Sequence, residues 1–403
     1  MVELKRFCIR RYTKKNHVQK TLEYLKGMGG VQMEFLNKVG DNSRPNGFAL
    51  AFDQLILQTM TAQDFDVGMA YYPNCLGFNR TEADHIWRPF ELRIWKSDSL
   101  KKSVDESCSE RHLEMMDYLE KFMRAYPGTP KIAQVWPTTL AHETLKDLYH
   151  ADEQFLAFFK KNRELIDQSF FIMVGDHGPR REGIGETRLG QYENLNPFLV
   201  VLIPSKYRNT SIHHQLYKKT NELMTHFDLH ATLMDIVKLQ PGAGFSDTSY
   251  RDLMPLSKGS SLFREWRGVR NCRTLPIPSA YCICQYNKTA VTDQMLVTKL
   301  GNFFAEQLNE LLRDSGLKDK CQIQYYNSTS TIMQIEDGDA MIYDMAVYLK
   351  PSGGLLTAHV RSSSAGLKLS SGFSRLNQYG QQGDCLVGNP LRPLCHCTGT
   401  TGP

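Results

Sequence analysis

The sequence predicts an α/β protein with a doubly wound, mostly parallel sheet and a smaller carboxy-terminal α+β region that is rich in cysteine. Residues 170–174 and 197–204 are apolar without alternation, which is typical of strands covered on both faces. A helical pattern over 145–166 joins a short strand at 131–135 to the first of these runs. Because strand, helix and strand follow one another, parallel pairing is expected.

Hydrophobic periodicity places further elements before and after these strands. Val18, Leu22 and Leu25 recur at helical spacing near the amino terminus. The other elements expected in this part of the chain are a helix at 16–28, a strand at 31–36, a polar loop at 38–46 and helices at 48–60, 113–126 and 225–237.

The carboxy-terminal part is predicted to be a helix packed on an antiparallel sheet. A long helix is expected at 292–314, and alternating apolar runs follow it. These runs lie at 322–330, 332–336, 341–350 and 355–361. Because 403 residues exceed one average domain, we expect a main domain at 1–270, truncated at its amino terminus, and a second domain at 271–403.

Charge and hydropathy argue against two classes of partner. The net charge is +5, and the basic residues are dispersed except between Lys5 and Lys15, so a solvated face explains them without nucleic acid. No apolar run reaches about 18 residues, so no transmembrane segment is expected in this chain. Met1 is followed by charged residues rather than by a signal peptide, and we therefore expect an upstream segment.

Cysteine usage indicates an oxidising compartment. Ten cysteines are present, and seven of them follow residue 270: Cys272, Cys282, Cys284, Cys321, Cys385, Cys395 and Cys397. The two C-x-C pairs among them lack the two-residue spacing of structural zinc sites, which favours disulfides. Sequons for glycosylation agree with an extracellular or secretory location, and they lie at Asn79, Asn209, Asn287 and Asn327.

The strand at 170–174 ends in the best candidate for a chemical site. Asp176 and His177 follow it and offer an anionic oxygen and a neutral nitrogen to a divalent cation. The alternative is that Asp176 caps a turn and His177 lies on the surface. Ser43, just before Pro45 at the expected start of a helix, is either a helix cap or an attacking hydroxyl.

Several segments, in order along nearly the whole chain, carry a family resemblance, and four of them matter most for the candidate site. They are residues 38–46, Ala141-His142-Glu143, Asp176-His177-Gly178 and residues 227–233. In this order they resemble motifs of the metazoan sulfatase-like family of unknown function (domain of unknown function two-two-nine), within the alkaline phosphatase superfamily. In the first segment Ser43 takes the hydroxyl position of the family's nucleophile loop, and Arg44 replaces the usual phenylalanine.

The resemblance implies an extracellular protein that hydrolyses phosphate or sulfate esters with the help of a metal ion. The substrate would be an anionic ester, either a small molecule or a glycan, and the metal would be zinc or calcium. The site residues that the resemblance implies are Ser43 and His142 for catalysis, Arg44 and Asn46 for substrate binding, and Asp176 and His177 for the metal.

Two departures from the family pattern lower the expected metal content. The family's first metal carboxylate falls near Phe7 here, where Glu3 is the nearest carboxylate, and Thr138 stands where two-metal relatives carry aspartate. One metal ion at most is therefore expected, and none if the lost carboxylate is decisive. The alternative function is a secreted pseudoenzyme that binds a glycan, a lipid headgroup or a protein without turnover.

Overall fold

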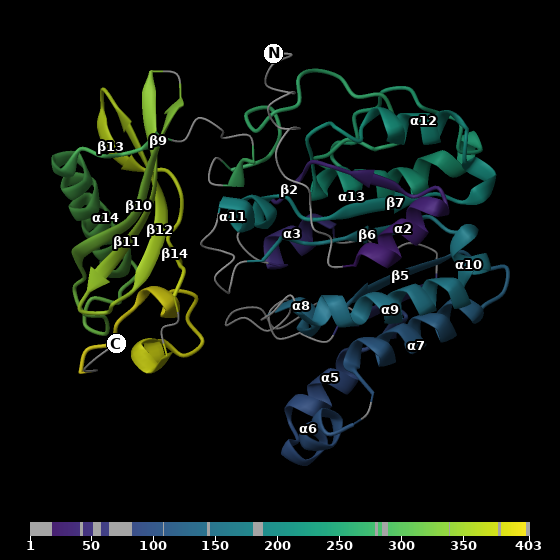
Figure 1. Ribbon diagram of the computed structural model, residues 1–403, viewed down its shortest axis with the longest axis horizontal. Coiled ribbons are helices and arrows are strands. Elements are labelled where there is room, and N and C mark those ends of the chain that lie inside the picture. Colours follow the sequence, from purple (N-terminus) through teal and green to yellow (C-terminus); the bar gives the residue numbers. More distant parts are fainter. Residues whose placement is uncertain are drawn as a thin grey trace. The chain divides into compact units, whose positions relative to one another are not determined.

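The chain, as a computed structural model, divides into two compact units, Met1–Ile277 and Pro278–Pro403 (Figure 1). The structure describes residues 18–40, 43–50, 58–63, 83–107, 109–142, 146–179, 188–278, 281–283, 289–337, 339–377 and 380–399. In these ranges the mixed α/β class that the sequence predicts is confirmed, but small sheets are found in place of one large doubly wound sheet.

The first small sheet carries the strand that leads to Asp176. Its strands lie in the order β1 (Val31–Met33), β7 (Leu199–Leu202) and β6 (Phe171–Val174), and both pairings are antiparallel. The prediction that the two apolar runs belong to a parallel sheet is therefore wrong. Continuous apolar character indicates burial, and every residue of β7 is indeed buried, but burial carries no information on strand direction.

Two further small sheets of the first unit are parallel. In one, β2 (Leu36–Asn37) pairs with β8 (Met224–Thr225). In the other, β3 (Gln58–Gln63) lies between β4 (His85–Ile86) and β5 (Lys131–Trp136). Because β2 and β8 run in the same direction, the segments that follow them leave from the same edge of their sheet.

The helix predicted at 48–60 is wrong at both ends. α3 (Ser43–Leu50) begins five residues earlier, and residues 58–60 belong to β3. Every residue of β3 pairs with a residue of β5, and alternate residues Met60 and Ala62 are buried, as strand geometry requires. The apolar run at 48–60 is compatible with a helix or a strand on local grounds, and at residues 58–60 pairing with the distant strand β5 selects the strand.

α2 (Gln19–Gly27) confirms the helix expected at 16–28. Its Leu22 and Leu25 share a core with apolar residues of α9 (Lys146–Lys161). Asp152 of α9 caps α2, because its carboxylate accepts the backbone N–H groups of Lys20 and Thr21 at 2.9 Å each. Further helices of this unit are α5 (Arg88–Trp95), α6 (Asp98–Asp105), α7 (Arg111–Arg124), α8 (Thr139–His142), α10 (Arg163–Asp167), α11 (Arg188–Leu195), α12 (Ser211–Lys218) and α13 (His226–Met234).

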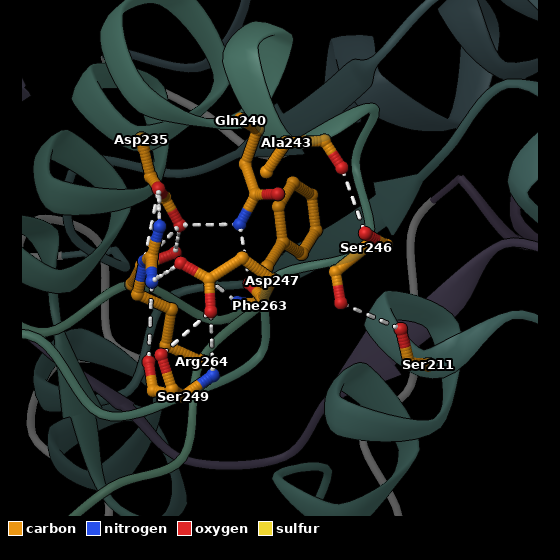
Figure 2. Close-up of polar contacts among 10 residues, drawn as sticks. Ser211, Asp235, Gln240, Ala243, Ser246, Asp247, Ser249, Phe263 and Arg264 are labelled. Atoms are coloured by element: carbon orange, nitrogen blue, oxygen red, sulfur yellow. Dashed lines mark hydrogen bonds and ion pairs between the residues drawn. The ribbon is translucent and has the colours of Figure 1, made fainter.

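A buried ion-pair network follows α13 in the sequence (Figure 2). The guanidinium of Arg264, which is 2% exposed, donates from Nε to both oxygens of Asp235 at 3.0 and 2.9 Å, and from Nη1 to Asp247 at 2.6 Å. Ser261 and Gln240 also donate to Asp235, at 2.7 and 3.2 Å. The charges of Arg264 and Asp235 are buried but paired and hydrogen-bonded, and with the partly exposed Asp247 they join the end of the helix to the loop that follows it.

Asp247 is expected to make the stability of the first unit depend on pH. Hydrogen bonds from Ser249 and Arg264 lower the pKa of Asp247 from 3.8 to about 2. A carboxyl group whose pKa is lower in the folded state stabilises the fold above its unfolded pKa, and this contribution disappears as the pH falls towards about 2. Urea unfolding across this window should show a smaller loss of stability in Asp247→Asn than in the wild type. Equal losses in the two proteins would contradict the prediction.

The unit Pro278–Pro403 contains one long helix packed on an antiparallel sheet, as predicted (Figure 1). In α14 (Gln294–Asp314), Leu300, Phe304 and Leu308 share a core with apolar strand residues. The sheet order is β13 (Gly366–Leu369), β12 (Leu355–Ser363), β11 (Ala340–Lys350), β10 (Tyr325–Asp337) and β9 (Thr289–Ala290), with β14 (Ser374–Arg375) paired to β12. The two runs predicted at 322–330 and 332–336 form the single strand β10.

Disulfides fasten the tail of this second unit. Cys321 is bonded to Cys395, and Cys385 is bonded to Cys397. Cys272 and Cys282 are also disulfide-bonded, whereas Cys284 lies outside the described residues. The prediction of disulfides rather than a zinc site is therefore confirmed for these cysteines. No helix in the described ranges is both long enough and apolar enough to cross a bilayer.

Candidate active site

Asp176 and His177 lie directly after β6, where the sequence places them. Their side chains are 18% and 14% exposed, so both remain accessible at the end of β6, whose residues are themselves partly buried. The next residue, Gly178, donates its N–H to the Asn194 carbonyl at 3.2 Å. A Cβ added to Gly178 would lie 2.0 Å from the Glu193 carbonyl oxygen, so this turn approaches α11 as closely as only glycine allows.

The start of α3, which carries Ser43, contacts the residues that follow β2. The buried Asn46 accepts the N–H groups of Val39 and Gly40 at 2.8 and 3.1 Å and donates to the Gly40 carbonyl at 3.1 Å. A Cβ on Gly40 would lie 2.1 Å from Pro45 Cγ. These contacts hold Val39 and Gly40, which follow β2, against α3, the helix that carries Ser43. The role of Asn46 in substrate binding stays a prediction, while its amide binds these backbone groups.

The structure brings Ser43 together with Asp176 and His177. Ser43 Oγ lies 3.4 Å from His177 Nε2, and the same Nε2 lies 3.4 Å from Asp176 Oδ2. His177 Nδ1 is 2.7 Å from the Gly178 carbonyl oxygen, which can only accept. In the neutral ring the proton therefore sits on Nδ1, and Nε2 presents a lone pair towards the serine and the aspartate.

This arrangement fits a divalent cation. Asp176 Oδ2 is buried without a hydrogen-bond partner and faces the lone pair of His177 Nε2, so two acceptors lie opposite each other. A cation between them would satisfy both, and the imidazole nitrogen suits zinc better than calcium. Within the described residues, three potential metal ligands come close together at Cys385, Cys395 and Cys397, but these cysteines form disulfides. Asp176 and His177 would provide two ligands to such an ion, and further ligands would have to come from other residues.

Lys38 is a charged residue beside this site that the sequence analysis missed. It directly follows β2, is 2% exposed, and donates from Nζ to Asn194 Oδ1 at 2.5 Å. The Asn194 carbonyl accepts the N–H of Gly178, so Lys38 is linked through one residue to the turn that carries His177. Such a buried ammonium group raises the local positive potential and favours an anionic ligand. The sequence signal that could have identified Lys38 is a charged residue immediately after a buried strand.

His226 is the second residue that the sequence analysis missed. It is the first residue of α13, is fully buried, and lies with Nε2 3.0 Å from the Gly175 carbonyl oxygen. Its Nδ1 is buried without a partner. Burial lowers the pKa of His226, against the opposing effects of the Gly175 hydrogen bond and the Asp176 charge. The ring is therefore a neutral donor to the residue that precedes Asp176.

The other predicted site residues are less informative. His142 ends α8 and is partly buried. The backbone of Arg44 lies in α3, but its side chain lies outside the described part of the structure, as does the segment around Phe7. Their predicted roles stay predictions.

Comparison with known proteins gives one family. The family described as "Protein of unknown function (DUF229)" matches residues 9–56 and 51–330. These ranges include the Ser43 loop, the turn at Asp176 and the start of α13. No curated protein matches the chain.

Proposed function

Since the chain belongs to the DUF229 family, which is alkaline phosphatase- and sulfatase-like, we propose that it is an extracellular, metal-dependent hydrolase of phosphate or sulfate esters. The observation that carries this proposal is the contact of Ser43 Oγ with His177 Nε2 at 3.4 Å, with Asp176 Oδ2 equally close to the same nitrogen. A candidate nucleophile thereby meets two candidate metal ligands. The doubly wound sheet of that superfamily is the proposed parent architecture, of which the small parallel sheets are parts.

The chain's own residues divide the chemistry between them. Ser43 Oγ forms a bond to phosphorus or sulfur while the bond to the ester oxygen breaks; the serine proton passes to water, and the leaving alkoxide takes a proton from water to become the alcohol. Water then hydrolyses the seryl ester and releases phosphate or sulfate. The positive end of the α3 dipole and the charge of Lys38 favour negative charge on the transferring group. A zinc ion held by Asp176 and His177 would lower the pKa of the serine hydroxyl and offset charge on the transferring group.

Loss of metal is the test of this proposal. Asp176→Asn removes the charge of one ligand but keeps its shape, and zinc affinity should fall by more than about a hundredfold. The measurement is zinc binding by competition with a chromophoric chelator, together with hydrolysis of p-nitrophenyl phosphate and p-nitrophenyl sulfate. Asp98→Asn, an exposed aspartate at the start of α6, is the matched control and should behave as wild type.

Two outcomes of this test would count against the proposal. Unchanged zinc affinity in Asp176→Asn would show that the metal assignment is wrong. If zinc binds but neither ester is turned over, the protein is better described as a binding module for an anionic glycan, a lipid headgroup or a protein.

The proposed location gives a separate prediction at the surface of the second unit. Asn327 is exposed and lies at a register shift of β10, between Tyr326 and Ser328, so it is available to carry a glycan. In protein secreted from eukaryotic cells, Asn327→Gln should lose the mass of one glycan, measured before and after enzymatic deglycosylation. Thr329→Ser keeps the acceptor sequence and should keep the glycan. An unchanged mass in Asn327→Gln would refute occupancy of this site.

A further inference from the structure

We propose that His226 is a positioning residue that holds Asp176 in place for metal binding through the carbonyl group of Gly175. This inference rests on the proposed function, because Asp176 is a metal ligand only under that function. The carrying observation is the 3.0 Å contact between His226 Nε2 and the Gly175 carbonyl oxygen. His226 is fully buried, so the contact is made away from competing water.

Without support from its neighbours, the backbone at Gly175 would be free to rotate. Glycine has no side chain to restrict its dihedral angles, and Asp176 follows it immediately. The N–H of Gly175 is fixed by the Phe198 carbonyl at 2.9 Å, on the β7 side. His226 fixes the carbonyl of the same residue from the α13 side. Because the Gly175–Asp176 peptide is planar, fixing this carbonyl also orients the backbone N–H of Asp176.

His226 acts through the backbone rather than as a ligand. A carbonyl oxygen only accepts, so Nε2 carries the proton and Nδ1 holds the lone pair. A third ligand would need its nitrogen close to the donor atoms of Asp176 and His177. Within the described ranges these three residues do not bring their donor atoms within 4.8 Å of one another. The geometry therefore favours a supporting hydrogen bond, of the kind that fixes ligand orientation in metal sites.

The position of His226 is itself firmly determined. Thr225, the N-cap residue of α13, forms a capping box with Asp228, and Thr225 also pairs with Asn37 of β2. Asp228 in turn accepts from Arg270 at 2.6 Å and from the Ser260 N–H at 2.8 Å. His226 thus connects the β2–β8 sheet, whose first strand leads to Ser43, with the sheet whose last strand leads to Asp176.

The test compares two replacements of His226. Glutamine can place an amide N–H near the position of Nε2, whereas leucine fills a similar volume without a donor. In metal-free protein, amide hydrogen exchange over residues 171–179 should be about fivefold faster in His226→Leu and close to wild type in His226→Gln. Zinc affinity, measured by chelator competition, should fall about 10- to 100-fold in His226→Leu and recover in His226→Gln.

A matched control is available in the same unit. His213 is also buried, at 4% exposure, and its Nδ1 accepts the N–H of Asn209 at 2.9 Å in the α12 region. His213→Leu removes a buried imidazole without touching Gly175, so exchange over 171–179 and zinc affinity should stay at wild-type values. If His226→Leu does not fold, His226→Asn replaces it, since the shorter amide cannot reach the carbonyl.

Each outcome decides for or against the inference. Wild-type exchange over 171–179 in His226→Leu would overturn it, and so would equal defects in the glutamine and leucine variants, which would indicate packing instead of the hydrogen bond. Failure of the proposed function looks different: zinc affinity would then be unchanged in Asp176→Asn, while the exchange measurement on metal-free protein would still decide whether His226 fixes Gly175.

Discussion

Replacement of Ser43 by alanine is expected to abolish ester hydrolysis while the fold and the zinc affinity stay near wild type. The substitution removes only the oxygen that lies 3.4 Å from His177 Nε2. Ser43 is partly exposed, so no internal cavity forms, and alanine is well tolerated in a helix. Loss of a nucleophile typically lowers kcat by about 10⁴-fold or more. The measurement is kcat/KM for p-nitrophenyl phosphate and p-nitrophenyl sulfate in zinc-loaded protein.

Two companion variants separate the loss of the nucleophile from other defects. Ser43→Thr keeps a hydroxyl at the same position, and turnover should remain measurable. Asp176→Asn should lose both zinc and turnover, whereas Ser43→Ala should lose turnover alone. Residual hydrolysis in Ser43→Ala at the wild-type rate would show that another group attacks the ester, and the role assigned to the Ser43 loop would then be wrong.

The sequence was sufficient for most elements of the fold but not for their pairing. The helical spacing of Leu22 and Leu25 predicted α2, and the apolar run before Asp176 predicted β6, because both signals are local. Strand direction depends instead on which segments meet. β7 follows β6 with α11 between them, yet the two strands pair antiparallel, with Ile172 opposite Val201. Neither run contains information on that choice.

In the candidate site, too, local motifs predicted some residues but not the contacts between distant segments. Ser43, Asp176 and His177 follow from motifs in short segments, although they are brought together only by the fold. His226 was missed because a histidine at the start of a helix is locally unremarkable, and its partner Gly175 lies 51 residues away in the sequence. Asn46 shows the opposite case, because it belongs to the recognised motif and its amide binds the backbone of Val39 and Gly40 in the same motif.

The largest effect on stability is expected at Arg264, which has no role in the proposed chemistry. Its guanidinium is 2% exposed and pairs with Asp235, which is fully buried, and with Asp247 (Figure 2). Arg264→Met keeps much of the side-chain volume but leaves the Asp235 carboxylate buried without its counter-charge. Breaking a buried pair in this way costs about 3–5 kcal/mol, because the remaining ion cannot be solvated. Urea unfolding of the variant should show this loss in the free energy of unfolding.

An exposed ion pair in the same unit is the control for this prediction, because breaking it should cost little stability. Lys102 of α6 and Glu106, the residue that follows the helix, are 73% and 67% exposed, and their charged groups lie 3.8 Å apart, so Lys102→Met should cost no more than about 0.5 kcal/mol. The double variant Arg264→Met with Asp235→Leu removes both buried charges and should be more stable than Arg264→Met alone, because no carboxylate of Asp235 is left unpaired. A double variant no more stable than Arg264→Met would mean that the cost arises from lost packing around the long arginine side chain.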